Sequence, residues 1–145
     1  MNSIEIYFDD IEPFSIHENI LVLHLNSLIK KELRETGDIS VVFCSDEYLL
    51  KMNKEYLNHD YYTDIITFDY VEGNVISGDL FISIERVKEN AEKYGSTLLK
   101  ELYRVVFHGT LHLVGYKDKT DNDKNLMRSK EDFYLSEVDF KGMEI

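Results

Sequence analysis

The apolar positions in the first part of the chain switch between the period of a strand and the period of a helix. Residues 4–8 alternate hydrophobic and polar side chains, which is typical of a half-buried β-strand. Between Ser15 and Gly37 the apolar residues recur every three or four positions, and Ser15 stands three residues before a Glu, as in a capping box. This segment is predicted to be a helix. A continuous apolar strand at residues 39–44 and a helix opened by Ser45 then give a β-α-β-α order.

The second part of the chain adds two strands and three helices. Residues 63–70 and 75–83 are rich in β-branched and aromatic side chains, and the short turn between them predicts an antiparallel pair. Helical spacing of apolar residues returns at 87–94, in the long apolar segment 97–114 and at 120–134. The pattern therefore predicts an α+β protein with α/β-like layers, in which four strands pack with about five helices.

Length and composition indicate one acidic domain. The 145 residues include 16 Lys and Arg against 28 Asp and Glu, giving a net charge of −12 and a pI near 4.7. This length predicts a single domain, residues 1–145, and the acidity excludes a generally basic nucleic-acid coat. The single cysteine, Cys44, excludes an intramolecular disulfide. An acidic start without a signal-peptide pattern, and no apolar run of membrane-spanning length, predict a cytoplasmic protein without membrane contact.

The apolar segment 97–114 contains two histidines at the spacing of a metal site. His108 and His112 lie one helical turn apart on the same face, near enough to bind one ion. Gly115 frees the chain to turn back, so Asp118 can bring a carboxylate to that ion and leave a fourth position for water. This set predicts one catalytic Zn²⁺, although two imidazoles and a carboxylate also suit Fe(II), Ni(II) or Co(II). The alternative is that both histidines are ordinary half-buried residues.

Two charged residues precede His108 on the same helical stripe. Glu101 is a candidate acceptor for the second ring nitrogen of a ligating histidine, and Arg104 is a candidate contact for a phosphate. An exposed Glu–Arg pair is the alternative. Gly109 follows the first histidine directly, at the position where a zinc protease of this spacing carries its general base, so peptide hydrolysis by that route is disfavoured.

Three motifs together resemble the bacterial rRNA-maturation endoribonuclease family, the YbeY-like proteins. Residues 108–116 (H-G-T-L-H-L-V-G-Y) are similar to the family signature, residues 63–68 (T-D-I-I-T-F) to its strand motif, and residues 78–80 (G-D-L) to its G-D-[IL] element. The resemblance implies a zinc-dependent, single-strand-specific endoribonuclease acting in 16S rRNA maturation and ribosome quality control. It further implies a zincin-like domain with a mixed, mostly parallel four-stranded sheet, and RNA and ribosome or ribosomal-protein partners without a nucleotide cofactor.

Two positions depart from the family pattern. Asp118 stands where the commonest motif has a third histidine, and Leu57 stands where the family usually has an arginine after the tyrosine of the second helix. The candidate substrate-binding residues are therefore those still present near the motifs, namely Thr63, Asp64, Arg104, Lys117 and Lys119. No side chain is assigned as catalytic beyond those that would hold a zinc-bound water. Asp64 and Asp79 are candidates for the general base.

The charge is unevenly distributed along the chain. Residues 1–72 hold 15 acids and 5 bases, whereas residues 100–130 hold seven bases and four acids. A local positive field around the metal segment could hold a phosphate backbone while the acidic remainder confines the contact. Leu57 and the acidic half favour an alternative, a metal-binding ribosome-assembly factor without nuclease activity. A metal-dependent hydrolase of another small substrate is a third hypothesis.

Overall fold

The computed structural model describes residues 3–143 and consists of one four-stranded sheet and five helices. The elements are β1 (Ile4–Phe8), α1 (Glu18–Lys31), β2 (Glu35–Cys44), α2 (Asp46–Leu57), β3 (Ile65–Asp69), β4 (Val75–Ser83), α3 (Ile84–Tyr94), α4 (Leu98–Val114) and α5 (Asp121–Ser136). The strand order is β1-β2-β4-β3, with the first two pairings parallel and β3–β4 antiparallel. The predicted α+β class, with its mostly parallel mixed sheet, is confirmed.

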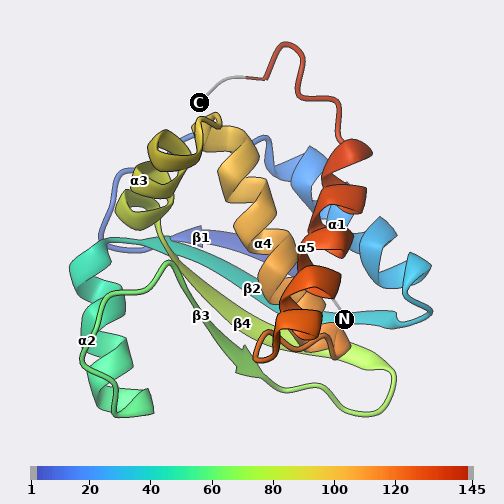
Figure 1. The fold of residues 1–145 in the computed structure, drawn as a ribbon, viewed down its shortest axis with the longest axis horizontal. Coiled ribbons are helices and arrows are strands. Elements are labelled where there is room, and N and C mark those ends of the chain that lie inside the picture. Colours follow the sequence, from blue (N-terminus) through green and yellow to red (C-terminus); the bar gives the residue numbers. More distant parts are fainter. Residues whose placement is uncertain (1–2, 144–145) are drawn as a thin grey trace.

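The two faces of the sheet are covered unequally. Alternate residues of β2 and β4, such as Phe43 and Leu80, lie in the main core beneath α1 and α4. The residues between them, including Cys44 and Phe81, face the other side of the sheet and form a smaller cluster with residues of α2. Figure 1 shows α4 crossing the sheet, with α5 in front of it and α1 alongside. The larger face therefore supplies a rigid platform for α4.

Glycines bring α4 unusually close to the sheet. A Cβ at Gly109 of α4 would lie 2.7 Å from Ile65 Cδ1 and 2.9 Å from Leu80 Cδ2. A Cβ at Gly78 of β4 would lie 2.5 Å from the carbonyl oxygen of Phe68 and 2.8 Å from Leu113 Cδ2. This close approach fixes the height at which α4 presents its side chains. Like every other helix in residues 3–143, α4 lacks the length and apolar content needed to cross a membrane.

Both predicted ends of the first helix are wrong. The helix begins at Glu18 instead of Ser15, because Ile16 is buried in the core and its carbonyl accepts a hydrogen bond from the hydroxyl of Tyr103 (3.0 Å). It ends at Lys31, well before Gly37, which lies within β2. A Cβ at Gly37 would lie 2.9 Å from the Ile76 carbonyl, so this glycine serves strand pairing beside a register shift.

Gly78→Ala is expected to lower the free energy of unfolding by about 1–3 kcal/mol, because the added methyl group meets a backbone carbonyl that no rotamer change can move. Urea denaturation measures the loss. Gly73→Ala is the control, since no atom lies within 4 Å of its Cβ position and its φ of +57° alone carries a cost. A Gly78→Ala protein as stable as the unmodified chain would contradict the close approach of β3 and α4 to Gly78.

Candidate metal centre

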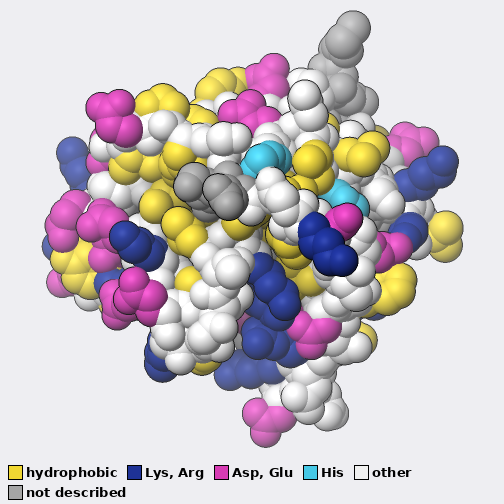
Figure 2. Space-filling view, turned by 90° about the horizontal axis from the view of Figure 1, so that it is seen from above, with side chains coloured by type: hydrophobic (Ala, Val, Ile, Leu, Met, Phe, Trp, Pro, Cys, Tyr) yellow, Lys and Arg dark blue, Asp and Glu magenta, His cyan; other side chains and the backbone are white. Residues whose placement is uncertain are grey.

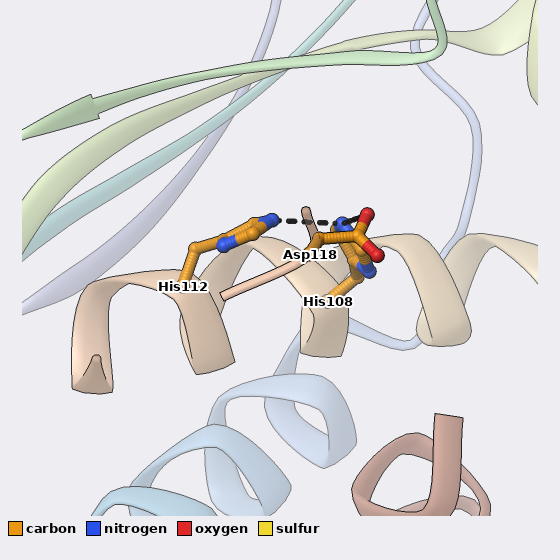
Figure 3. A group of neighbouring side chains, drawn as sticks. All are labelled: His108, His112 and Asp118. Carbon is orange, nitrogen blue, oxygen red and sulfur yellow. Dashed lines mark hydrogen bonds and ion pairs between the residues drawn. The ribbon is translucent and has the colours of Figure 1, made fainter. Parts of the chain in front are cut away.

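His108 and His112 point toward one another from successive turns of α4. Their Nε2 atoms are 3.0 Å apart, and their rings meet nearly edge to face with centroids 4.6 Å apart (Figure 3). Both side chains are half-buried on an otherwise apolar helix. The predicted one-turn spacing therefore brings two imidazole nitrogens to one point.

The outer ring nitrogens are held by groups that can only accept hydrogen bonds. His108 Nδ1 lies 2.7 Å from a carboxylate oxygen of Glu131, and His112 Nδ1 lies 2.8 Å from the carbonyl oxygen of Tyr116. Each Nδ1 must therefore carry the proton, which leaves each neutral Nε2 with a lone pair. Two lone pairs 3.0 Å apart repel unless a proton or a cation lies between them. The donor set thus fits a bound metal ion.

Asp118 completes a group of three potential ligands. Its Oδ2 lies 3.6 Å from His108 Nε2, and one ligand atom from each of His108, His112 and Asp118 lies within 4.8 Å of the others. The chain reaches this position because α4 ends at Gly115, whose φ of 125° turns it back toward the helix. Two imidazoles and a carboxylate could hold a divalent metal ion and leave a coordination position open.

The turn that carries Asp118 is fixed by a buried carboxylate from another part of the fold. Glu32, at the end of α1, accepts hydrogen bonds from the hydroxyls of Tyr116 and Tyr134 and from Lys130 Nζ (3.1 Å). Burial raises the pKa of Glu32, but these hydrogen bonds outweigh it and hold the net pKa below its usual value. Because Tyr116 is anchored through its side chain, its carbonyl is positioned to accept from His112.

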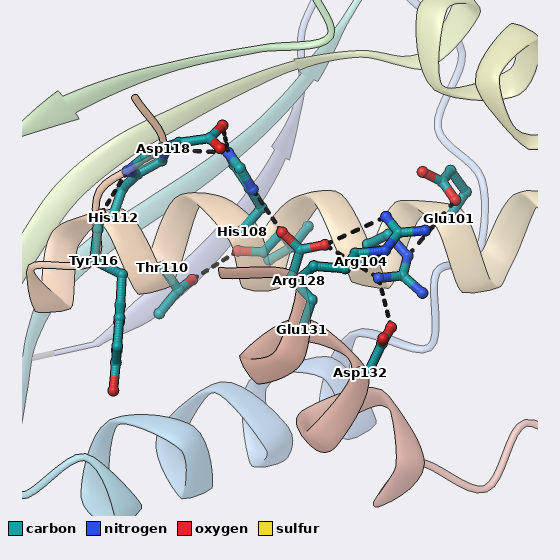
Figure 4. Close-up of polar contacts among 11 residues, drawn as sticks. Glu101, Arg104, His108, Thr110, His112, Tyr116, Asp118, Arg128, Glu131 and Asp132 are labelled. Carbon is teal, nitrogen blue, oxygen red and sulfur yellow. Dashed lines mark hydrogen bonds and ion pairs between the residues drawn. The ribbon is translucent and has the colours of Figure 1, made fainter. Parts of the chain in front are cut away.

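Glu131 of α5 is the functional residue that the sequence pattern did not reveal. It is buried, with 4% of its surface exposed, and its other oxygen accepts from Arg104 Nη1 at 3.1 Å. Figure 4 shows His112, His108, Glu131 and Arg104 following one another along α4. Glu131, not Glu101, therefore occupies the acceptor position beside His108. The capping box of Thr120 with Asp123 predicts where α5 begins, but it does not show which face of α5 packs against α4.

Arg104 pairs with carboxylates and is largely shielded from solvent. Besides Glu131 it contacts Asp132 at 2.9 Å and Glu101 at 4.0 Å, and only 14% of its side chain is exposed. Glu101 is itself buried, and this burial raises its pKa although Arg104 opposes the shift. The alternative of an exposed Glu–Arg pair is therefore wrong, and the arginine neutralises the buried acids that surround it.

The two imidazoles differ in their affinity for a proton. Burial lowers the pKa of His108, but the hydrogen bond and negative charge of Glu131, together with Asp118 and Asp64, raise it above its usual value. For His112, burial and the neighbouring His108 lower the pKa. His112 is thus held neutral, as ligation requires, whereas the carboxylates around His108 favour its protonated form.

Two cavities meet at the three potential ligands. The larger, of about 620 Å³, lies between α4 and α5 and is lined by His108, Asp118 and Asp64, among others. The other, of about 350 Å³, lies toward the α2–β3 loop and contains all three ligands, again with Asp64. Burial raises the pKa of Asp64, although His108 opposes the shift. Asp64 is therefore the one general-base candidate that faces the centre from both sides.

The remaining sequence candidates lie at different distances from this centre. Thr63 and Leu57 line the smaller cavity, whereas Lys117 and Lys119 are exposed on the turn on either side of Asp118. Asp79 lines a separate cavity with residues of α2 and β3, away from the three ligands. It is thereby removed as a candidate general base.

Comparison with known proteins places this centre in a family. The family described as Endoribonuclease YbeY matches residues 9–139. The protein named Endoribonuclease YbeY from Cytophaga hutchinsonii is 58% identical over 113 residues, which are 77% of this chain and 79% of that protein. The protein of the same name from Parabacteroides distasonis is 45% identical over 134 residues, covering 92% of this chain and 94% of that protein.

A solved structure agrees with the fold. The solution structure of the protein TM1509 from Thermotoga maritima superposes with a TM-score of 0.68 at 29% sequence identity, and the match covers 97% of this chain and 99% of that one. The sequence match thus extends to the architecture that carries the paired histidines. On this evidence the chain belongs to the YbeY endoribonuclease family.

Proposed function

We propose that residues 1–145 form one metal-dependent endoribonuclease domain that hydrolyses phosphodiester bonds of single-stranded RNA in 16S rRNA maturation and ribosome quality control. Membership of a family whose relatives are named endoribonucleases supports RNA as the substrate. The observation that carries the proposal is the convergence of two Nε2 lone pairs and the Asp118 carboxylate on one point, between two open cavities.

We propose Zn²⁺ as the ion, held by His108, His112 and Asp118. When bound, such an ion polarises a phosphoryl oxygen and lowers the pKa of a water molecule. Glu131 keeps His108 in the ligating tautomer, and the Tyr116 carbonyl does the same for His112. Asp64, half-buried in the same cavity as His108, is our candidate to accept a proton from the attacking water and to return it to the leaving oxygen. Thr63, on the adjoining wall, is a candidate contact for the RNA backbone.

One observation favours a second candidate function, a ribosome-assembly factor that retains the metal without cutting RNA. Leu57, 39% exposed, lines the smaller cavity, and the family resemblance implies that an arginine usually stands at this position. In this alternative the ribosome or a ribosomal protein is the partner, and the metal acts as a structural clip. The two functions separate in a complementation assay, since a metal-free variant would then still restore rRNA processing.

His112→Ala is expected to remove the metal and to lower cleavage of single-stranded rRNA. Changes to groups that merely orient a ligand cost 10–100-fold, so the loss of a ligand should cost at least about 100-fold. Protein stripped with a chelator is reloaded with Zn²⁺, Fe²⁺, Ni²⁺ or Co²⁺ in turn, and bound metal is counted by elemental analysis. His24→Ala on α1 is the matched control and should retain both properties. Undiminished cutting by the His112→Ala protein would refute the proposal.

Glu131→Gln is expected to weaken metal binding by about 10–100-fold, because the amide is a weaker acceptor for His108 Nδ1 than the carboxylate. Competition with a chromophoric chelator measures the affinity. Asp132→Asn is the matched control, since Asp132 also pairs with Arg104 (2.9 Å) but does not contact His108. If both variants lost the same amount of metal affinity, the loss would come from the broken Arg104 ion pair and not from the orientation of His108.

A further inference from the structure

The larger cavity continues past the metal centre into a second depression between the start of α4 and α5. This depression has a volume of about 350 Å³ and shares Tyr94, Arg104 and Arg128 with the larger cavity. Lys124 lines the larger cavity and Lys100 the depression. We call this continuous surface, with Tyr94, Lys100, Lys124 and Arg128 along it, the α4–α5 groove.

The solvent-facing charge of the α4–α5 groove is positive. Two of its acids, Glu101 and Glu131, are buried and paired with Arg104, so they present little charge outward. The other two, Asp64 and Asp118, lie at the metal centre end of the groove. Lys124 and Arg128, in contrast, are exposed, and 60% of the Arg128 side chain is accessible. Seen from above the view of Figure 1, Lys and Arg side chains gather below the centre of the surface (Figure 2).

Arg128 is tied to the metal centre through a shared carboxylate. Its Nη1 lies 3.8 Å from Glu131 Oε1, while the other oxygen of Glu131 accepts from His108 Nδ1 at 2.7 Å (Figure 4). The Arg128 guanidinium is therefore linked through the Glu131 carboxylate to His108, a potential metal ligand. It remains exposed enough to form bidentate hydrogen bonds with a phosphate.

The other side of the centre offers no comparable charge. Among the described residues that line the smaller cavity, none is Lys or Arg, and Leu57 lies there instead. Of these two cavities, only the larger is lined by lysine and arginine side chains from residues 3–143. An RNA strand crossing the centre would find lysine and arginine side chains along the α4–α5 groove, and none from the described part of the chain along the lining of the smaller cavity.

We propose that the α4–α5 groove binds the phosphates of single-stranded RNA through Lys124 and Arg128 and stacks one base on Tyr94, directing the strand to the metal centre. The inference rests on the proposed function and names the contacts of its substrate. Tyr94 is 64% exposed at the edge of the groove, with Lys93 Nζ 5.5 Å from its ring centroid. A cationic track with an adjoining aromatic ring is the arrangement that binds single strands without reading their sequence.

The double variant Lys124→Ala/Arg128→Ala tests the phosphate contacts. Binding of metal-loaded protein to a fluorescein-labelled, unstructured 12-nucleotide RNA is measured by fluorescence anisotropy, alongside KM and kcat for its cleavage. The dissociation constant and KM are expected to rise about tenfold at low salt, and the slope of log affinity against log salt to fall by about 1.4, the value for two lost contacts with a single strand. Bound metal should stay near its original level, because Arg104 still pairs with Glu131 at 3.1 Å, and KM should change by a larger factor than kcat.

The double variant Lys51→Ala/Lys54→Ala is the matched control, because it removes the same number of positive charges, two, from α2. Its affinity for the RNA should be unchanged, which separates a local contact from overall charge. Unchanged binding by the groove variant, or an equal loss in the control, overturns the inference. If His112→Ala abolishes cleavage while the groove variant binds and cuts normally, the proposed function stands and only the groove assignment fails.

If the metal-loaded protein cuts no RNA, the proposed function fails, but anisotropy still tests the groove.

Tyr94 is tested in the same assay by a pair of substitutions. Tyr94→Ala should weaken binding about fivefold or more, while Tyr94→Phe, which keeps the ring, should bind as the unmodified protein does. Equal binding by both Tyr94 variants and the unmodified protein would overturn the stacking contact.

Discussion

The convergence of two imidazole lone pairs is the constraint on which the rest of this structure depends. Neutral Nε2 atoms 3.0 Å apart repel one another, so each ring must be held in place from behind. Glu131 holds one ring from α5, and the Tyr116 carbonyl holds the other from the turn after α4. This turn is held in position because the Glu32 carboxylate accepts a hydrogen bond from the Tyr116 hydroxyl. Elements far apart in the chain thus cooperate to maintain an arrangement that a proton or a metal ion between the two nitrogens would stabilise.

The local parts of this design could be predicted from sequence, and the long-range parts could not. His108 and His112 share a face because helical geometry fixes residues four apart, and Gly115 allows the turn that returns Asp118. Glu131 is 23 residues from the histidine it orients, in a helix whose many charges are typical of a solvated face. Its inward position depends on how α5 packs against α4, which no local pattern records.

The same reasoning explains the errors elsewhere. A Ser followed by Glu at capping-box spacing predicts a helix start at Ser15, but burial of Ile16 and its hydrogen bond from Tyr103 outweigh that local preference. Glu101 and Arg104 lie on the predicted stripe, yet the approach of α5 buries them together with Glu131. A buried carboxylate left without a counter-charge would be costly, so Arg104 is needed where it is and is withdrawn from solvent.

This withdrawal bears on how an acidic protein can attract a polyanion. A divalent ion held by two neutral imidazoles and the Asp118 carboxylate carries one positive charge less than the same ion held by three imidazoles. Leu57 brings no charge to the opposite wall, where no lysine or arginine among the described residues lines the smaller cavity. With Arg104 neutralised by its neighbours, the exposed cations that line the cavity beside the centre are Lys124 and Arg128. A small set of placed cations can therefore serve a phosphate backbone while the net charge remains −12.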